Sequence, residues 1–442
     1  MKFDIDKLQQ ALQPLQLRES FLLGLSGGMD SVVLLSAVAE LKDSGGLVGD
    51  LRVIHINHGL HSEADRWQNF CQQLCLDRQI EFHCARVNLK SAGELAGIES
   101  KARTERYRVF EATMKPGEVL LLAHHLDDQL ETLLFRLNRG SSLKGLAAIP
   151  QHRHFASGEI FRPLLNFSRA ELLQYAQQQK LEWVEDDSNK DIEFDRNFLR
   201  REILPAIESR WPNYRSSWQK SLQLITEADA LLDELAESDL ESLRDNNPSA
   251  ISVTGLCSLS KARQRNLLCR WIEQAGLADL GWNQLHHLVE EFIPQAGSEG
   301  LLAVDGYEIG KFNNLLYLVK PMPTPQESKN WSPLENAKFV VEGSGVLKAR
   351  EVPGRGMSKR LADSLEVRFR QGGESCRLKG RPSKSLKKLM QEAQIEPWWR
   401  DRLPLIYRDN ELLCIPGIGV CATAAAKPGE AGIELEWEPA VG

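Results

Sequence analysis

Short apolar runs alternate with amphipathic segments over residues 1–190 of the chain. Four apolar runs predict strands, at residues 21–25, 51–56, 81–87 and 118–123. Helical patterns follow them at residues 30–42, 62–78, 97–114 and 125–138. Alternation at this spacing predicts right-handed βαβ units, and therefore a doubly wound α/β domain with a parallel sheet. Ligands of such sheets bind at the carboxyl ends of the strands, so the residues that follow each strand are the first candidates for a site.

The pattern becomes almost purely helical from about residue 168 to 242, and a mixed segment continues to about 320. Residues 320–333 carry four prolines and are typical of an interdomain linker. Beyond them we expect a helix near 383–394 and strands at LPLIY and ELLCIPG. The predicted domains are an α/β domain at 1–205, a mostly helical middle domain at 206–320, a linker at 321–333 and a small α+β domain at 334–442.

Composition and cysteine spacing exclude several classes of protein. A chain of 442 residues with 42% hydrophobic and 26% charged residues is typical of a globular protein with two or three domains. The start, MKFDIDKLQQALQPL, has no apolar signal region, and no apolar run is long enough to cross a bilayer, so we expect a cytoplasmic protein. The eight cysteines include no C-x-x-C pair, which argues against a zinc ribbon, and Cys71 and Cys75 are expected to be buried thiols.

Charge is distributed unevenly along the chain. The net charge of −7 argues against general nucleic-acid affinity, and residues 226–246 are strongly acidic. Residues 376–390, however, hold six basic residues and no acid: Arg377, Lys379, Arg381, Lys384, Lys387 and Lys388. We call these six residues the basic cluster. It favours a local site for a polyanion, with Trp398 and Trp399 close behind for base stacking; a solvated loop and helix face is the alternative.

The motif SGGMDS follows the first predicted strand directly and precedes a helix. The first N–H groups of a helix lack partners and favour an anion, and Gly27 and Gly28 let the backbone approach phosphate oxygens. The loop lacks the Lys-Ser/Thr pair of the G-x-x-x-x-G-K-[ST] motif. Asp30 would repel a phosphate unless a cation intervened, which indicates Mg²⁺. A plain tight turn is the alternative.

A second polar group follows the fourth predicted strand, in HHLDDQLETLLFRLNRG. Helical spacing places the leucines of this segment on one face and His124, Asp128 and Glu131 on the other. Two carboxylates and a histidine on one face can hold Mg²⁺ and orient a nucleophile. The alternatives are a solvated face and, less favoured, a zinc site.

Longer segments of the chain resemble one family. SGGMDS is similar to the pyrophosphate loop (PP-loop) of the N-type ATP pyrophosphatases. Five further segments resemble tRNA(Ile)-lysidine synthetases: HINHGLH (55–61), ARTERYRVF (102–110), HHLDDQLETLLFRLNRGSSLKGLAAI (124–149), RPLL (162–165) and DDSNKDIEFDRNFLRREILP (186–205). The basic C-terminal segment also resembles that family's last domain. The combination is specific and spans nearly the whole chain, whereas the loop alone is shared with other enzymes.

The resemblance implies a ligase that modifies the wobble cytidine of the isoleucine tRNA with the anticodon CAU. ATP, with Mg²⁺, first adenylates the base oxygen of that cytidine and releases pyrophosphate. The amine of free lysine then displaces AMP to give lysidine, which pairs with AUA rather than AUG codons. The implied partners are this tRNA and L-lysine, and a homodimer is a further expectation that no motif supports.

The same resemblance implies roles for individual residues. The residues that bind ATP are Ser26, Gly27, Gly28, Met29, Asp30, Ser31, Asn57, His58 and His124. The catalytic residues are Asp30 and Asp128, which also hold the metal, together with Glu131, Arg103 and Arg106. The tRNA contacts are Asn189, Arg196, Asn197, Arg200 and the basic cluster.

Alternatives remain for several of these residues. Arg103 and Arg106 either neutralise the adenylate phosphate or pair with Glu99 and Glu105 on the surface. His58 is either an adenosine contact or an ordinary strand-end histidine. Residues 186–200 either reach the anticodon or form a structured loop that clamps the helical segment.

Two rival functions are considered. The first is another enzyme with the same loop, such as a tRNA cytidine thiolase or a GMP or asparagine synthetase. The missing C-x-x-C pairs and the Lys2 that follows Met1 weaken it. The second is a nucleotide-sensing or RNA-binding protein without catalysis, which would have no need for Asp30, Asp128 and Glu131.

Overall fold

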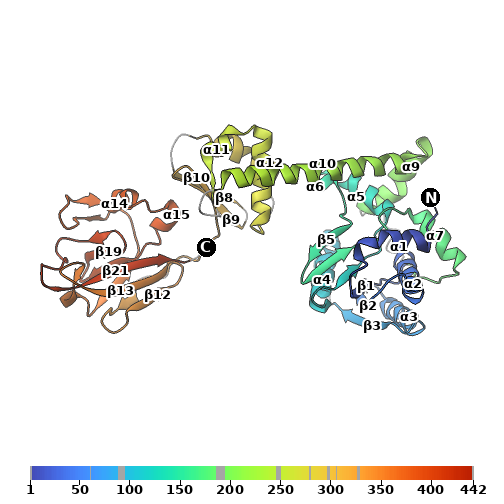
Figure 1. Cartoon of the computed structure of the whole chain (residues 1–442), viewed down its shortest axis with the longest axis horizontal. Helices are drawn as coiled ribbons and strands as arrows, with labels where there is room; N and C mark the ends of the chain where they lie inside the picture. The colour runs from blue at the N-terminus through green and yellow to red at the C-terminus, as the bar shows by residue number, and fades with distance from the viewer. Residues whose placement is uncertain are drawn as a thin grey trace. The chain divides into compact units, whose positions relative to one another are not determined.

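The computed structural model describes residues 2–59, 61–87, 95–185, 195–244, 250–277, 280–295, 299–304, 306–325 and 329–440, with the backbone alone for 95–100. The chain folds as two compact units, Met1–Ala230 and Leu231–Gly442 (Figure 1). The division falls within the long helix α10 (Tyr214–Leu243). The finer domain boundaries at 205/206, 320/321 and 333/334 stay predictions.

The first unit is built on a six-stranded sheet in the order β3-β2-β1-β4-β6-β5. Its strands are β1 (Ser20–Gly24), β2 (Asp50–Asn57), β3 (Glu81–Arg86), β4 (Val119–Leu121), β5 (His152–Phe155) and β6 (Gly158–Phe161). All neighbours pair in parallel except the β5–β6 hairpin. The predicted parallel sheet is confirmed. Because β1 lies between β2 and β4, the crossovers diverge there, and the crevice in which doubly wound sheets bind ligands is expected at the carboxyl ends of β1 and β4.

Nine helices of this unit cover the sheet or extend from it within the described residues. They are α1 (Ile5–Ala11), α2 (Met29–Asp43), α3 (Ala64–Leu76), α4 (Leu95–Thr113), α5 (Leu126–Asn138), α6 (Leu143–Leu146), α7 (Arg169–Gln178), α8 (Asp195–Phe198) and α9 (Leu204–Arg210). The predicted helix positions agree with α2–α5 to within about two residues.

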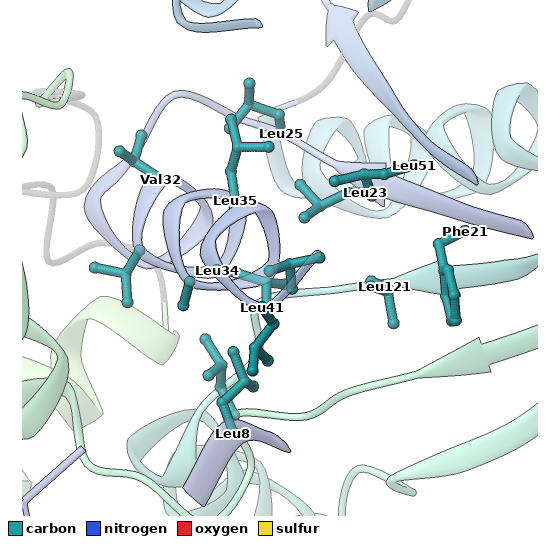
Figure 2. Packing of buried hydrophobic residues seen from close by; sticks show 14 of the residues in the cluster. Leu8, Phe21, Leu23, Leu25, Val32, Leu34, Leu35, Leu41, Leu51 and Leu121 are labelled. Atoms are coloured by element: carbon teal, nitrogen blue, oxygen red, sulfur yellow. The ribbon is translucent and has the colours of Figure 1, made fainter. Parts of the chain in front are cut away.

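Helix α2 lies inside the largest hydrophobic core. Its side chains, among them Leu34 and Leu41, pack with Leu8 of α1 and with Leu23 of β1 (Figure 2). Ten of its 15 residues are buried, so the helix is apolar on nearly every side. Truncating one such leucine to alanine typically costs about 2–5 kcal/mol. This packing fixes the direction in which the helix presents its N-terminus at the carboxyl edge of the sheet.

The second unit begins with a small α+β part. Helices α11 (Val253–Ser258), α12 (Lys261–Gln274) and α13 (Trp282–His287) accompany an antiparallel sheet. The sheet has the order β7 (Ala250–Ser252), β10 (Leu315–Val319), β9 (Tyr307–Phe312) and β8 (Glu299–Val304). The predicted mixed segment up to residue 320 therefore contains a complete small sheet.

The rest of the second unit is β-rich. One sheet has the order β11 (Lys329–Trp331), β15 (Leu365–Arg368), β18 (Leu405–Arg408), β19 (Glu411–Ile415) and β20 (Gly419–Val420). Another has the order β12 (Lys338–Val341), β13 (Gly345–Pro353), β21 (Ala431–Pro439) and β14 (Met357–Ser358). A short pair, β16 (Ser375–Cys376) and β17 (Lys384–Ser385), precedes α14 (Leu386–Glu392) and α15 (Pro397–Arg400).

Two expectations for this unit are corrected. The end of the predicted linker 321–333 is the strand β11, whose Trp331 is buried in the core. The predicted helix at 383–394 begins only at Leu386, because the two preceding residues pair in β17 with β16.

The remaining sequence expectations concern cysteines and membranes. Cys71 and Cys75 are fully buried thiols, as predicted. Cys376 and Cys421 form a disulfide, with Cα atoms 6.3 Å apart. In the part of the chain that the structure describes, no helix combines the length and the apolar character needed to cross a membrane.

Candidate active site

The glycine loop occupies the carboxyl end of β1 and leads directly into α2. Gly27 has a φ of +90°, and a Cβ at that position would lie 3.1 Å from the Cys71 sulfur, so only glycine fits without strain. The loop is braced from within: Ser31 Oγ donates to the carbonyl of Gly28 at 2.8 Å and lies 3.1 Å from Ser26 Oγ. The Gly27 carbonyl accepts from Val184 N at 2.9 Å. The structure thus holds a braced glycine turn at the start of a buried helix.

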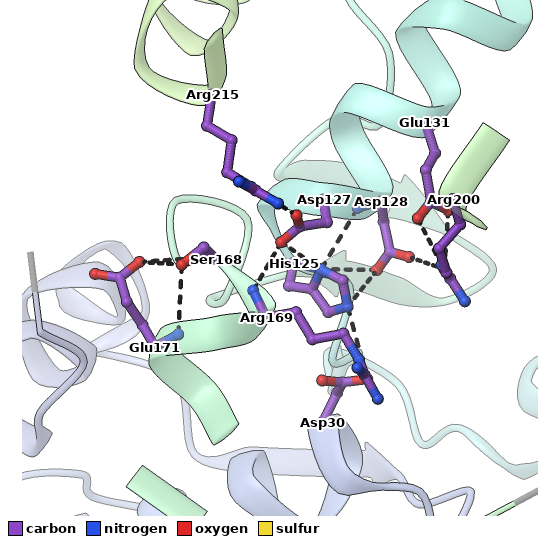
Figure 3. A network of polar contacts seen from close by, with 10 residues as sticks. All are labelled: Asp30, His125, Asp127, Asp128, Glu131, Ser168, Arg169, Glu171, Arg200 and Arg215. Atoms are coloured by element: carbon purple, nitrogen blue, oxygen red, sulfur yellow. Dashed lines mark hydrogen bonds and ion pairs between the residues drawn. The ribbon is translucent and has the colours of Figure 1, made fainter. Parts of the chain in front are cut away.

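The carboxylates of Asp30 and Asp128 meet around His125. Asp30 stands in the first turn of α2 and Asp128 in the first turn of α5. One oxygen of each lies 3.6 Å from His125 Nε2, and Asp127 Oδ2 lies 3.8 Å from His125 Nδ1 (Figure 3). The neighbourhood of the β1 and β4 ends, expected from the sequence, is therefore present in the structure.

His125 is charged at neutral pH because of these neighbours. Burial alone would lower its pKa, but Asp128, Asp30 and Asp127 raise the pKa to about 9. His125 is also the N-cap of α5: its backbone N–H donates to Asp128 Oδ2 at 3.0 Å. The Asp128 N–H lies 3.4 Å from His125 Nδ1, which is long for a hydrogen bond. A protonated ring carries a hydrogen on Nδ1 and therefore cannot accept this bond. We therefore regard the His125 imidazolium as an ion partner of the carboxylates. The sequence pattern had pointed to His124 and not to His125.

Glu131 is buried and bound by Arg200 from a distant part of the chain. Arg200 Nε and Nη2 donate to the two carboxylate oxygens at 2.6 and 2.8 Å, and Nη2 also lies 3.5 Å from Asp128 Oδ1 (Figure 3). Burial raises the pKa of Glu131, and Arg200 opposes that rise. The alternative of a solvated helix face is wrong for Glu131, which is only 2% exposed.

Asp127 has a structural role beside the site. It accepts from the backbone N–H of Arg169 at 2.7 Å and from Arg215 Nε at 2.9 Å (Figure 3). Burial would raise the pKa of Asp127, but these donors and His125 hold the pKa below its ordinary value. Asp127 therefore ties the starts of α7 and α10 to the start of α5.

The donor set can be compared with the needs of Mg²⁺. Among the described residues, no group of three or more histidine, cysteine, aspartate and glutamate side chains is arranged to hold a metal ion. Asp30 Oδ1, however, is buried without a hydrogen-bond partner. Mg²⁺ commonly takes one or two carboxylates and fills its remaining positions with phosphate oxygens and water. Asp30 and Asp128 therefore fit a Mg²⁺ that arrives with a nucleotide, rather than a complete protein cage.

His124 follows β4 and lies close to cationic groups. Arg162, which follows β6, donates from Nε to His124 Nδ1 at 3.3 Å. Burial lowers the pKa of His124, Asp128 opposes this, and Arg162 and Arg106 lower the pKa further. The neutral ring, which accepts through Nδ1, carries its proton on Nε2. The predicted grouping of His124 with Glu131 on one face of a helix is not observed, since His124 precedes α5.

Arg103 and Arg106 lie on α4 and gather around Tyr107, at 5.2 and 5.9 Å from the guanidinium carbon to the ring centre. Glu105, one of the two carboxylates suggested as surface partners of Arg103 and Arg106, binds Arg108 at 2.8 Å. The side chain of Glu99 lies outside the described residues.

Asn57 is the last residue of β2, and His58 follows it. The Asn57 amide is fully engaged: it donates to Asp65 and Gln68 and accepts from Gly59 N at 3.0 Å. It shapes the turn between β2 and α3. His58 Nδ1, by contrast, is buried without a partner, and burial lowers the pKa of its ring.

The predicted tRNA contacts lie in several elements, and one of them lies outside the described residues. Asn189 lies outside the described residues, whereas Arg196 and Asn197 lie on α8. In the basic cluster, Lys384 and Arg381 both pair with Glu392. Because Lys384 belongs to β17, the predicted helical face of Lys384, Lys387 and Lys388 is wrong.

Four members of the basic cluster are exposed and make no salt bridge with any described residue: Arg377, Lys379, Lys387 and Lys388. Of these, Lys379 Nζ donates to the carbonyl of Ala426 at 2.8 Å. The two tryptophans behind the cluster differ in their exposure, and stacking on a base stays a prediction for Trp398 alone. Trp399 is buried against Trp437, and Trp398 packs on Tyr317 at a ring distance of 5.1 Å.

Family models match three parts of the chain. The PP-loop domain matches residues 2–207, the TilS substrate binding domain matches 251–317, and the TilS substrate C-terminal domain matches 365–437.

Full-length relatives share one name. The chain is 38% identical to the tRNA(Ile)-lysidine synthase of Coxiella burnetii, over 99% of this chain and 97% of that protein. It is 37% identical to the enzyme of the same name from Pseudomonas aeruginosa, over 98% and 96%. Among solved structures, a U34-tRNA thiolase from Methanococcus maripaludis is 19% identical with a TM-score of 0.43, covering 50% of this chain and 78% of that one. A TilS C-terminal domain is 21% identical with a TM-score of 0.19, covering 26% of this chain and 100% of that one.

Proposed function

The chain belongs to the tRNA(Ile)-lysidine synthase family, and on that premise we propose how its residues carry out the reaction and on which substrates. As a member of this family it is a tRNA-modifying ligase that uses ATP and forms a carbon–nitrogen bond. The cytidine thiolase alternative is less supported, because the full-length relatives are named lysidine synthases.

We propose that the tRNA substrate is the isoleucine tRNA with the anticodon CAU and that the amine substrate is free L-lysine. The cytoplasmic location of the protein and its assembly as a homodimer stay predictions. The observation that carries the proposal is the meeting of the glycine loop with Asp30 and Asp128 at the carboxyl ends of β1 and β4. That crevice is where a doubly wound sheet binds a nucleotide.

In the first half reaction, the loop from Ser26 to Ser31 binds the β- and γ-phosphates of ATP through backbone N–H groups at the start of α2. The wobble cytidine then attacks the α-phosphorus with its base oxygen, and pyrophosphate leaves. The loop stabilises the charge that develops on the leaving group without the lysine of a γ-phosphate-transferring loop. Arg103 and Arg106 neutralise the phosphate that remains on the base as an adenylate. His58, whose Nδ1 is buried without a partner, is the proposed contact to the adenosine.

Asp30 and Asp128 are the proposed ligands of Mg²⁺, which supplies charge neutralisation for the phosphates when bound. His125 holds the two carboxylates close to one another before the nucleotide enters, since its charge attracts both. Arg200 and Glu131 act as positioning residues, because their paired contacts fix the side of Asp128 that faces away from His125.

In the second half reaction, the lysine amine attacks C2 of the adenylated cytidine and AMP leaves. The carbon–nitrogen bond forms as the bond between C2 and the adenylate oxygen breaks. Carboxylates suit an ammonium substrate, and Asp128 is the proposed residue that orients the amine. We assign this role to Asp128 because its side chain is partly exposed, whereas Glu131 is buried and acts through Arg200.

The dependence on lysine tests this proposal. Without lysine, the enzyme is expected to release pyrophosphate and accumulate an adenylated tRNA; with lysine, it is expected to release AMP and add one lysine per tRNA. Separate assays of pyrophosphate and AMP distinguish the two steps. Release of AMP that does not depend on lysine would contradict the proposal.

A further inference from the structure

Tyr107 of α4 is surrounded by four guanidinium groups. The guanidinium carbons of Arg103 and Arg153 both lie 5.2 Å from the centre of its ring, and that of Arg106 lies at 5.9 Å. Arg162 Nη2 lies 3.5 Å from the Tyr107 hydroxyl. These residues come from three segments: α4, the edge strand β5 and the residue that follows β6 (Figure 1). We call Tyr107 with these four arginines the tyrosine–arginine cluster.

Arg162 is a buried cation without a carboxylate partner among the described residues. It is 2% exposed. Its donors go to neutral acceptors: Pro150 O at 2.6 Å, His124 Nδ1 and the Tyr107 hydroxyl. Burial lowers its pKa, and Arg153 and Arg103 lower the pKa further. A buried charge is normally compensated by an opposite charge, and here the neighbours are cations.

Two further members of the cluster, Arg103 and Arg153, also lack a carboxylate partner within the described part of the chain. Both side chains are exposed. Arg108, one residue past Tyr107, shows the ordinary surface arrangement, because it binds Glu105 at 2.8 Å. The Tyr107 hydroxyl reports the excess positive charge: burial would raise its pKa, but the four arginines lower the pKa overall.

The strand register directs Arg153 into this cluster. Side chains alternate along a strand, so Arg153 and Phe155 share one face of β5. Phe155 contacts the Tyr107 ring edge-on at 5.6 Å, which places that face of β5 against α4. The Tyr107 ring therefore holds Arg103 and Arg153 at one site instead of leaving them on separate surfaces.

An anion that contacts Arg153 is a different group from the phosphates that the glycine loop would bind. β5 is separated from β1 by β4 and β6, so the two strands are three spacings, or about 14 Å, apart. The phosphates of one ATP molecule on the loop are already matched by the start of α2. A tRNA whose wobble base enters the β1–β4 crevice brings backbone phosphates to the rim of that crevice.

We propose that the tyrosine–arginine cluster is a binding site for a backbone phosphate of the tRNA anticodon loop, with Arg153 as the direct contact and Tyr107 and Arg162 as positioning residues, while Arg103 keeps its role at the adenylate phosphate. The inference rests on the proposed function, since it takes the anticodon loop as the substrate at this edge of the sheet. It assigns a role to Arg153, Tyr107 and Arg162, which carry none in the reaction described above.

Affinity for an unmodified CAU-anticodon tRNA transcript, measured over a range of salt concentrations with the full-length protein, tests the proposal. Arg153→Ala is expected to weaken binding roughly five- to tenfold and to reduce the slope of log affinity against log salt by about 0.7, the value for one phosphate contact on a single strand. Arg153→Lys should restore the slope because it keeps the charge. The matched control Arg108→Ala removes one exposed cation from the adjacent surface and should leave both quantities unchanged.

The affinity for ATP alone, measured on the same variants, separates the two sources of phosphate. It should be unchanged in Arg153→Ala. An unchanged tRNA affinity and salt slope in Arg153→Ala, or a loss of ATP affinity of the same size as the loss of tRNA affinity, would overturn the proposal.

These results also distinguish the inference from the proposed function. If the wild-type protein attaches lysine to the tRNA while Arg153→Ala binds tRNA normally, only the phosphate site is wrong. If the wild-type protein binds the tRNA in an Arg153-dependent way but attaches no lysine, the phosphate site stands and the proposed function fails.

Discussion

Asp30 and Asp128 are held where two helix starts converge, and neither contributes to the hydrophobic core. Their side chains are 29% and 23% exposed, and each lies 3.6 Å from the His125 imidazole. Like charges this close are tolerated because His125 is protonated between them. The same arrangement suits a cation that bridges the carboxylates and the phosphates of a nucleotide.

Asp30→Ala and Asp128→Ala are each expected to lower the rate of pyrophosphate release by roughly a thousandfold, the order of effect of removing one charge-stabilising group from an active site. The fold should persist, because both side chains are partly exposed. Circular dichroism and a pyrophosphate assay check this. Asp43→Ala, at the exposed far end of α2, is the matched control. Pyrophosphate release within a few-fold of wild type in either site variant would contradict the assignment.

At the scale of residues, the sequence predicted that the starts of α2 and α5 meet. It did not predict every contact that the side chains there make. Asp30 and Asp128 were identifiable because each follows a strand by a few residues. The choice between His124 and His125 depends on which ring lies between Asp30 and Asp128, and two adjacent histidines in the sequence do not reveal it. The contact of Arg200 with Glu131 spans 69 residues, and the approach of Arg153 to Tyr107 depends on a hairpin that places β5 beside α4.

At the scale of elements, a buried ion pair between Arg52 and Glu118 links β2 to the start of β4. Arg52 of β2 donates to both oxygens of Glu118, which precedes β4, at 2.7 and 2.9 Å. Glu118 also accepts from Ser20 Oγ at the start of β1 at 3.0 Å and from Lys115 N at 2.9 Å. One carboxylate therefore ties together the three strands on which the active site depends.

The pH dependence of stability should report this pair. Burial would raise the pKa of Glu118, but Arg52, Lys115 N and Ser20 hold it below the ordinary value of 4.5. Because the folded-state pKa is depressed, the stabilisation is fully present above about pH 4.5 and is lost as the pH falls through the folded-state value. We expect Glu118→Gln to lower the free energy of unfolding at pH 7 by about 3 kcal/mol, since it leaves Arg52 buried without its counter-charge.

Urea unfolding at several pH values checks this expectation. The difference between wild type and Glu118→Gln should shrink as the pH falls below 4.5. Exposed Glu111→Gln, near the end of α4, is the control and should track the wild type at every pH. A difference that stays constant across the acid range would show that Glu118 acts only through packing.

The elements that the sequence predicted correctly are those with strong periodicity. Strands β1, β2 and β4 and helices α2–α5 carry apolar runs or an apolar face, because they line hydrophobic cores. The edge strand β3 has no buried residue and was predicted from its place in the alternation. The hairpin of β5 and β6 was missed, since β5 is an edge strand with mostly exposed, polar residues. Strand β11 was taken for linker because prolines precede it, although Trp331 is buried through pairing with β15.

At the scale of the whole molecule, tRNA affinity has to arise from local charge. The chain carries a net charge of −7, so its mean field repels RNA. Many cations of the second unit are already neutralised, such as Lys359 by Glu351 and Arg350 by Glu434. Arg377, Lys387 and Lys388 are exposed and have no salt bridge within the described residues, so we expect them to contribute most of the basic cluster's attraction.

Changing Arg377, Lys387 and Lys388 together to alanine should weaken tRNA binding and reduce the salt slope by very roughly 0.7–0.9 for each phosphate that the protein no longer binds. ATP affinity should hardly change, because the glycine loop lies in the first unit. The control removes the same number of charges at Arg350, Lys359 and Arg360, which pair with glutamates. Equal effects of the two triple variants would mean that net charge alone, and not the basic cluster, determines affinity.

The central claim, that this chain joins lysine to the wobble cytidine of a CAU-anticodon isoleucine tRNA, is tested most directly by mass spectrometry of the modified nucleoside. The unmodified transcript is incubated with ATP, Mg²⁺ and isotopically labelled lysine, then digested to nucleosides and position-specific fragments. We predict one labelled lysyl group per tRNA, on the cytidine at the first anticodon position, and none when ATP is omitted. A labelled lysyl group at another position would contradict the claim. An ATP-dependent product that carries no lysyl group would contradict it as well.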